Sequence, residues 1–124
     1  MESLRESLNA ITAYNQKSAE HIREDEAKTD HYEDIIGSYL VKLSARKIGE
    51  SDSALAAEYL RIIGDFERIA DHSVNILESA EEMQQKGIAF SAAALQEYAT
   101  MAGAVREVTA LAYDSFVSGD VQAA

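Results

Sequence analysis

Proline is absent from this chain of 124 residues, so no residue forces a long helix to break. Apolar residues recur at every seventh position in the middle of the chain, at Leu55, Ile62, Ile69, Ile76 and Met83. A companion row beside it comprises Tyr59, Phe66, Ser73 and Ala80. Because an α-helix returns to the same face about every 3.6 residues, the two rows predict one long helix with a single buried stripe.

The same kind of periodicity runs through most of the chain and predicts four helices, at 2–14, 18–47, 53–86 and 92–117. The polar residues 15–18 suit a break, and residues 49–53 form the clearest loop of the sequence. Short connections make consecutive helices antiparallel neighbours. The expected fold is therefore all-α, an up-and-down antiparallel helical bundle with three long helices and one short one.

Several residues have the side chains that helix ends prefer. Asp52 or Ser53 is expected to cap the start of the central helix, and Gly87 suits a left-handed cap at its end. Ser91 is the expected N-cap of the last helix, with Phe90 as the preceding hydrophobic staple residue.

The formal net charge of −11, from 22 acidic and 11 basic residues, limits the choice of partners. A field of this sign repels phosphate backbones, so we expect no nucleic-acid partner and favour cations or basic protein surfaces. Cysteine is absent, which excludes disulfides and thiolate metal sites and fits a reducing compartment. No apolar run approaches the ~20 residues that a membrane span needs, so we expect a soluble domain.

Acidic side chains follow the edge of the buried stripe on the central helix. Glu67 and Asp71 are four residues apart, so their carboxylates project side by side from successive turns, and Glu78 lies on the same edge. Like charges at this spacing weaken a helix by a few tenths of a kcal/mol. The pattern indicates either an ordinary solvated face or a positive partner held between the carboxylates.

The helix expected at 18–47 repeats this pattern. Glu26 and Asp30 are again four apart, and Glu33 continues the row. Antiparallel packing could bring the two rows face to face, and such a cluster must be protonated, solvated or neutralised by cations. Oxygen ligands suit magnesium, calcium, manganese or iron better than zinc, so the spacing alone does not name a metal.

Other polar and aromatic residues have simpler interpretations. The histidines His21, His31 and His72 are expected at the surface, outside any metal site. Arg61 and Arg68 are expected to pair with Asp65 in solvent. The tyrosines Tyr32, Tyr39 and Tyr59 are expected in the core or at its rim. Gly64 lies in mid-helix, where it marks either a close approach or a tolerated defect.

Two motifs of this chain resemble the PhoU family of phosphate-uptake regulators. Residues 67–72, Glu-Arg-Ile-Ala-Asp-His, followed by Asn75 and Ile76, look most like the cytoplasmic PhoU-like region of bacterial sodium-phosphate cotransporters. Residues 23–30, Arg-Glu-Asp-Glu-Ala-Lys-Thr-Asp, fit the other acidic motif of the family. The resemblance covers about residues 15–118 and implies three-helix bundles that bind multinuclear metal, iron or zinc. The implied ligands are Glu26, Asp30, Glu67 and Asp71, with Glu33, Asn75 and Glu78 as further candidates.

The chain departs from the family pattern in two places. A second repeat would begin near Ser91 and stop at Ala124 before its own acidic motif, and the first helix is short for the family. We therefore expect one PhoU-like domain, residues 1–124, that is a truncated or excised piece of a longer chain. The last helix either fills the groove left by the missing sequence or swaps into a neighbouring chain, which would make a homodimer.

Motifs of catalysis are not found. The sequence contains no Gly-rich phosphate loop, no His-Glu-x-x-His and no cysteine nucleophile, so we expect no enzyme. The resemblance implies a regulatory module of phosphate transport, cytoplasmic and tethered to the inner face of the plasma membrane, whose partner is a membrane transporter domain in cis or in trans. The alternative is a metal-free helical bundle that binds another protein.

Overall fold

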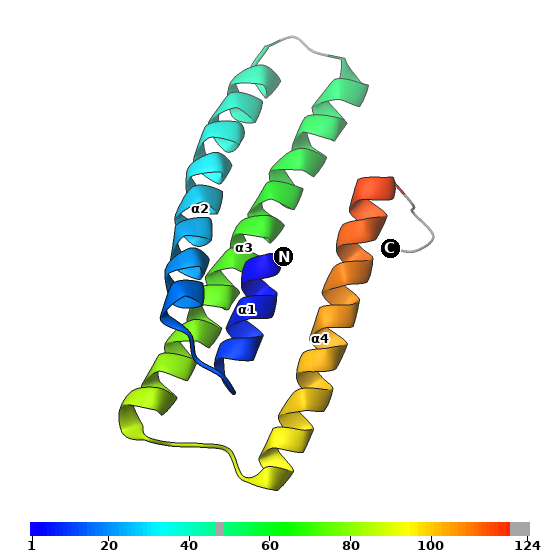
Figure 1. Cartoon of the computed structure of the whole chain (residues 1–124). Coiled ribbons are helices and arrows are strands. Elements are labelled where there is room, and N and C mark those ends of the chain that lie inside the picture. Colours follow the sequence, from blue (N-terminus) through cyan, green and yellow to red (C-terminus); the bar gives the residue numbers. More distant parts are fainter. Residues whose placement is uncertain (47–48, 120–124) are drawn as a thin grey trace.

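The computed structural model describes residues 1–46 and 49–119, and these residues form four helices and no strand. The helices are α1 (Glu2–Ala10), α2 (Gln16–Ser44), α3 (Glu50–Lys86) and α4 (Ala92–Ser118). The long helices α2 and α3 run antiparallel, and α4 returns along α3 (Figure 1). The short α1 lies between α3 and α4 at one end of the bundle. The predicted all-α antiparallel bundle of three long helices and one short one is confirmed.

The first two helices are bounded differently from the prediction. α1 ends at Ala10 instead of residue 14, and α2 begins at Gln16 instead of residue 18. Asn15 is the reason for the early start, because its side-chain oxygen accepts hydrogen bonds from the backbone N–H groups of Lys17 at 2.8 Å and Ser18 at 3.3 Å. α2 ends at Ser44, and residue 47 of the predicted helix lies outside the described residues.

The predicted loop at 49–53 is wrong. α3 begins at Glu50 with Gly49 as its N-cap, so Asp52 and Ser53 lie inside the helix and do not cap it. Glu50 and Asp52 occupy the first turn, where the positive end of the helix dipole favours carboxylates. At the other end, Gly87 has φ 62° and ψ 30°, which confirms the predicted left-handed cap.

α4 begins and ends close to where the sequence places it. The side chain of Ser91 accepts a hydrogen bond from the N–H of Ala94 at 3.2 Å, as expected of an N-cap. Phe90, the residue before the cap, stacks on Tyr98 with ring centroids 5.6 Å apart. Gly119 closes the helix in the left-handed conformation, at φ 68°.

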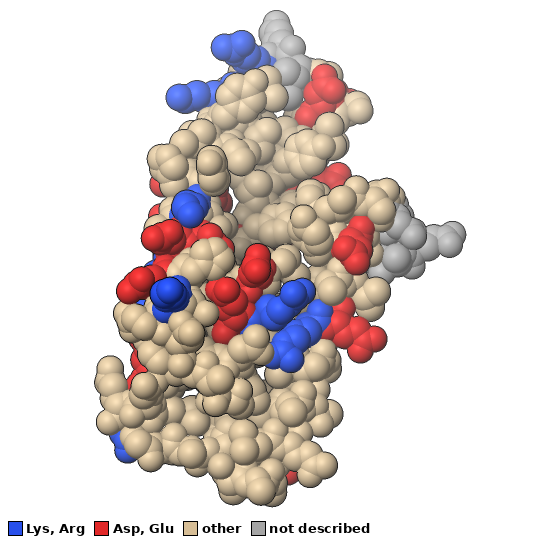
Figure 2. Space-filling model, in the orientation of Figure 1, with Lys and Arg blue, Asp and Glu red and all other residues tan. Residues whose placement is uncertain are grey.

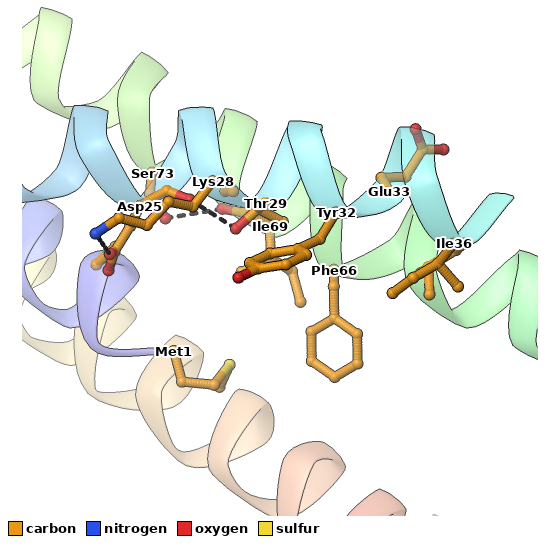
Figure 3. A pocket seen from close by; sticks show the side chains of 13 residues that line it. Met1, Asp25, Lys28, Thr29, Tyr32, Glu33, Ile36, Phe66, Ile69 and Ser73 are labelled. Atoms are coloured by element: carbon orange, nitrogen blue, oxygen red, sulfur yellow. Dashed lines mark hydrogen bonds and ion pairs between the residues drawn. The ribbon is translucent and has the colours of Figure 1, made fainter. Parts of the chain in front are cut away.

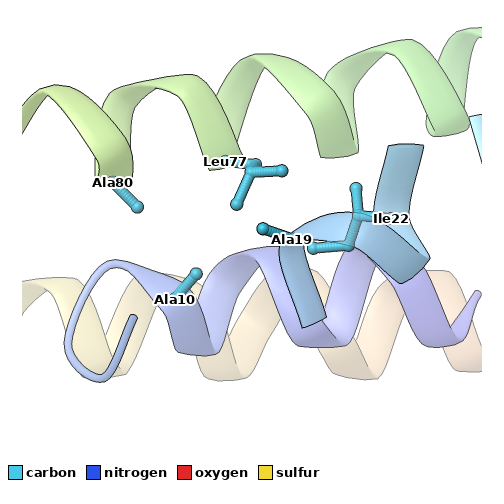
Figure 4. Packing of buried hydrophobic residues seen from close by; sticks show 5 residues of the cluster. All are labelled: Ala10, Ala19, Ile22, Leu77 and Ala80. Atoms are coloured by element: carbon cyan, nitrogen blue, oxygen red, sulfur yellow. The ribbon is translucent and has the colours of Figure 1, made fainter. Parts of the chain in front are cut away.

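The tightest packing lies where α1 meets α2 and α3. Ile22 of α2 and Leu77 of α3 are completely buried, and Ala10, Ala19 and Ala80 surround them (Figure 4). The small side chains of the alanines let the three helices approach closely around the larger side chains of Ile22 and Leu77. A second cluster, formed by Leu4, Leu8 and Ala102, joins α1 to α4.

Beyond α1 the predicted stripe is not covered. Leu55 is 46% exposed and Tyr59 is 45% exposed, and Tyr32 and Tyr39 are more exposed still. The nine residues of α1 extend about 14 Å, whereas the 37 residues of α3 extend about 55 Å. The short helix therefore leaves the other half of the α2–α3 pair without a third layer. The prediction that Tyr32, Tyr39 and Tyr59 lie in the core or its rim is wrong for this reason.

Asp65 has the partners that the sequence predicts. Its carboxylate lies 3.1 Å from a guanidinium nitrogen of Arg61 and 3.8 Å from one of Arg68, and all three groups are solvent-exposed. Within residues 1–46 and 49–119, no helix combines the length and the hydropathy needed to cross a membrane.

Gly64→Ala should stabilise the protein by about 1 kcal/mol, because glycine loses more backbone entropy than alanine when a helix forms. A Cβ atom at Gly64 would have nothing within 4 Å, so the close approach that the sequence allowed is not present and alanine fits without strain. Thermal or urea unfolding measures the change. Gly87→Ala is the control and should destabilise, since residue 87 has positive φ. Equal effects at both positions would contradict the explanation.

Candidate carboxylate site

The register of α2 against α3 decides which carboxylates meet. Ile22 packs with Leu77 near one end of the pair, and a Cβ on Gly37 would lie 3.9 Å from side-chain atoms of Leu60 and Ile63 further along. In this antiparallel register Glu33 lies opposite residues 65–66, next to Glu67. Asp30, one turn earlier on α2, lies opposite residues 68–69, between Glu67 and Asp71 along α3.

The negative charges that act on Glu67 come from three other predicted ligands, Asp30 and Glu33 on α2 and Asp71 on α3. The pKa of Glu67 is raised, first because the half-buried carboxyl is desolvated, and then because Asp71, Glu33 and Asp30 place negative charge near it. Arg68 lowers this pKa, but its effect is the smallest of these. Among the described residues, no cation lies within ion-pair distance of these four carboxylates. The sequence therefore identified an acidic cluster that spans two helices.

The other three candidate ligands lie further along the pair. Glu26 is half-buried one turn before Asp30, and in the same register it lies opposite residues 72–73. Asn75 is exposed, at the next turn of α3 after Asp71. Glu78 is exposed and acts on Arg23, whose pKa its charge helps to raise, and it is not among the charges that act on Glu67. The structure thus groups Asp30, Glu33, Glu67 and Asp71 but does not group Glu26, Asn75 and Glu78 with them.

The carboxylates of the cluster are not arranged around a common point. In the part of the chain that the structure describes, no three Asp, Glu or His side chains are close enough together to hold a metal ion. The donor atoms nevertheless suit a hard cation, because they are all carboxylate oxygens on two helices that pack against each other. Rotation of exposed side chains would be required to bring three of them onto one ion.

A hollow of about 380 Å³, which the sequence did not indicate, lies between α2 and α3 on another face of the pair. Asp25, Thr29 and Tyr32 contribute to its wall from α2, and Phe66 and Ser73 contribute from α3 (Figure 3). In this view the carboxylate of Glu33 points away from the other labelled side chains. The spacing of Asp25, Thr29 and Tyr32, at i, i+4 and i+7, is the sequence signal that could have revealed this second polar face.

Asp25 also belongs to a polar cluster that fastens α1 to α2. Ser3 donates a hydrogen bond of 2.6 Å to the Asp25 carboxylate. The Nδ1 atom of His21 lies 2.8 Å from Glu6, and its Nε2 atom lies 3.6 Å from Asp25. His21 is therefore an inter-helix contact and not only a surface residue, whereas His31 and His72 are exposed as predicted.

His21→Gln should lower the melting temperature near pH 5.5 and have little effect near pH 8.5. The hydrogen bond to Glu6, the charge of Asp25 and the remaining charge of Glu6 raise the pKa of His21 in the folded protein. A histidine whose pKa is higher in the folded state stabilises the fold when it is protonated. This stabilisation is complete below the unfolded-state pKa of about 6.5 and is lost as the pH rises through the folded-state pKa. Melting curves of both proteins across this range measure the difference. His72→Gln is the control, and a pH-independent loss for His21→Gln would refute the assignment.

Fold and cluster together define a class of protein: a helical-bundle module with an acidic patch shared by two antiparallel helices and no recognisable catalytic motif. The family model of the PhoU domain matches residues 1–80, which include α1, α2 and most of α3 with all seven predicted ligands. The chain belongs to the PhoU domain family, a regulatory, non-catalytic family associated with phosphate transport.

The match confirms that the two acidic motifs belong to a PhoU domain, and it does not address the likeness to sodium-phosphate cotransporters. It does not extend to α4, which begins after residue 80. Neither the curated proteins nor the solved structures include a significant match to this chain.

Proposed function

We propose that this chain is the cytoplasmic regulatory module of a sodium-phosphate cotransporter, and that cations on the acidic cluster control its conformation. Membership of the PhoU family supports the role in phosphate transport. The motif at residues 67–72 supports the link to cotransporters through its resemblance to their PhoU-like region. The partner would be the transporter domain, attached in cis or bound in trans, and the bundle would lie at the inner face of the plasma membrane.

The observation that carries the cation hypothesis is the environment of Glu67. Desolvation, followed by the charges of Asp71, Glu33 and Asp30 from two helices, raises the pKa of this group. A hard cation would cancel that repulsion and would link α2 to α3 through Asp30, Glu33, Glu67 and Asp71. Glu26, Asn75 and Glu78 would complete or orient the ligand set if several ions bind. Iron, manganese, magnesium and calcium suit these oxygens better than zinc.

Metal binding should be lost in the double variant Glu67→Gln and Asp71→Asn, which keeps the shape of both side chains and removes their charge. Titration calorimetry and melting curves with Mn²⁺, Fe²⁺, Mg²⁺, Ca²⁺ or Zn²⁺ measure this. For the wild type, ligand at 100 times Kd should add about 2.7 kcal/mol of stability. Without metal the double variant should melt about 1–2 °C higher than the wild type, because like-charge repulsion is relieved.

Glu20→Gln with Glu24→Gln is the matched control. These exposed residues of α2 are also four apart and lie outside the group of charges that act on Glu67. Their neutralisation should leave metal binding unchanged. If the wild type binds none of the five ions, the cation hypothesis fails and the module is a metal-free interaction bundle.

A further inference from the structure

The short α1 occupies only one end of a trough that continues along α3. Met1, the residue before α1, lines the hollow of about 380 Å³ between α2 and α3 and also a second hollow of about 580 Å³ between α3 and α4. Phe66 and Ile69 line both hollows as well. The two hollows therefore adjoin along Met1, Phe66 and Ile69, and together we call them the trough, with α3 as its floor and α2 and α4 as its walls. Figure 2 shows this face hollowed between the upper parts of α2 and α4.

The surface of the trough is apolar and exposed to an unusual degree. Ile36 is 39% exposed on the α2 side, Leu55 is 46% exposed on the floor, and Phe116 is 47% exposed on the α4 side. Tyr32, Tyr59 and Tyr113 extend the same surface. Contiguous apolar surface of this kind marks a place where another molecule binds.

The dimensions of the trough suit a helix. From Ile69, beside Met1, to Leu55 the floor extends over fifteen residues of α3, whose ends are about 21 Å apart. A helix of about 14 residues has this length. α1 itself shows how such a helix packs, because its Leu4 and Leu8 lie against Ile69, Ile76 and Ala102 at the filled end of the trough.

The charges beside the trough distinguish between possible occupants. The charged residues that line the hollows are Asp25, Lys28 and Glu33 on the α2 side and Glu58, Arg61 and Asp65 on the α4 side. Lys28 lies 3.9 Å from Asp25 and Arg61 lies 3.1 Å from Asp65, which leaves the carboxylates of Glu33 and Glu58. Within residues 1–46 and 49–119, neither carboxylate has a basic group within ion-pair distance. With a net charge of −11, a second copy of this chain would be repelled, whereas Lys or Arg flanking an apolar face would be attracted.

We propose that the trough is the docking site of a basic amphipathic helix of about 14 residues, which belongs to a partner protein and lies end to end with α1. Its apolar residues, spaced i, i+3 or i+4 and i+7, bind Leu55, Phe66 and Ile36, and a basic residue beside them pairs with Glu58. This inference identifies a docking surface for the proposed regulatory module, but it does not depend on cations. The trough and the carboxylates of Glu67 and Asp71 lie on different faces of α3, so either proposal can fail without the other.

A synthetic 15-residue peptide tests the inference. The probe carries leucines at helical spacing on one face and lysines on the other, and fluorescence anisotropy measures its binding to the full chain. We expect at least 10-fold weaker binding when the lysines are replaced by glutamates. A peptide of the same composition, scrambled so that no apolar face forms, should also bind at least 10-fold more weakly.

Variants of the protein locate the binding site. Leu55→Glu and Ile36→Glu should each weaken peptide binding at least 10-fold, and both residues are exposed enough for the fold to tolerate the change. Leu111→Glu is the matched control, because Leu111 is 53% exposed on α4 and lines neither hollow. It introduces the same charge and should leave binding unchanged.

Four outcomes would overturn the proposal. No measurable binding of the lysine peptide would do so, and equal binding of the scrambled peptide would reduce the effect to charge attraction. Equal effects of Leu55→Glu and Leu111→Glu would place the site elsewhere. Sedimentation that shows a wild-type dimer, converted to a monomer by Leu55→Glu, would make a second copy of the chain the occupant.

Discussion

Leu77→Ala should reduce the free energy of unfolding by about 2–5 kcal/mol, a large fraction of the stability of a domain of this size. Leu77 is completely buried and lies at the centre of the cluster that joins α1, α2 and α3. Truncation removes apolar surface from the core and leaves a cavity, since Ile22 and the surrounding alanines cannot move in to fill it. For a chain of this length the melting temperature should fall by about 8–20 °C.

Leu111→Ala is the matched control for this substitution. Leu111 has the same chemistry but is 53% exposed, so its truncation should cost less than about 0.5 kcal/mol. Urea or thermal unfolding, followed by circular dichroism, measures both variants. If the two substitutions had similar effects, the cluster around Leu77 would not be the main core of the bundle.

Ala102→Asp should detach α4 from the rest of the bundle. Ala102 is only 2% exposed and packs against Leu4 and Leu8 of α1. The short aspartate side chain cannot reach solvent from this position, and an uncompensated buried charge costs about 3–5 kcal/mol. Two hydrogen bonds also attach α4 to α1. The Tyr98 hydroxyl donates to the Leu8 carbonyl at 2.8 Å, and the Arg106 guanidinium donates to the side-chain oxygen of Asn9 at 2.7 Å. We expect these to be lost together with the apolar contact.

Hydrogen exchange gives the readout for this variant. Amides of α4 should lose protection by more than a hundredfold, because 3 kcal/mol corresponds to about two factors of ten in the docking equilibrium. Amides near Ile22 and Leu77 belong to a separate cluster and should keep most of their protection. Ala104→Asp, at an exposed position of the same helix, is the control. Unchanged protection of α4 in Ala102→Asp would show that this contact does not hold the helix.

The secondary structure was predictable because its signals are local. The side chains of Ser91 and Asn15 cap their own helices, and Gly87 adopts a left-handed conformation that only neighbouring residues determine. The prediction failed at residues 49–53, where polar residues suggested a loop. Glu50 and Asp52 instead stabilise the first turn of α3, and polar residues suit the N-terminus of a helix as well as a loop.

The candidate site was predictable in part. Helical spacing placed Glu67 beside Asp71 and Asp30 near Glu33, and antiparallel packing puts the α2 row near enough for its charges to act on Glu67, without gathering three carboxylates around one point among the described residues. The register of the two helices was not predictable, since it depends on how Ile22 meets Leu77 and how Gly37 meets α3. That register groups four candidate ligands and leaves Glu78 beside Arg23.

By itself the sequence determined the four helices, the caps at Gly87 and Ser91, and the acidic edges of α2 and α3. Each of these depends on residues within a few turns of one another. Only the tertiary structure decided which apolar residues are buried. Burial requires a neighbouring element, and α1 is too short to cover the far half of the α2–α3 pair. The same apolar row is therefore core at Ala80 and open trough at Tyr59.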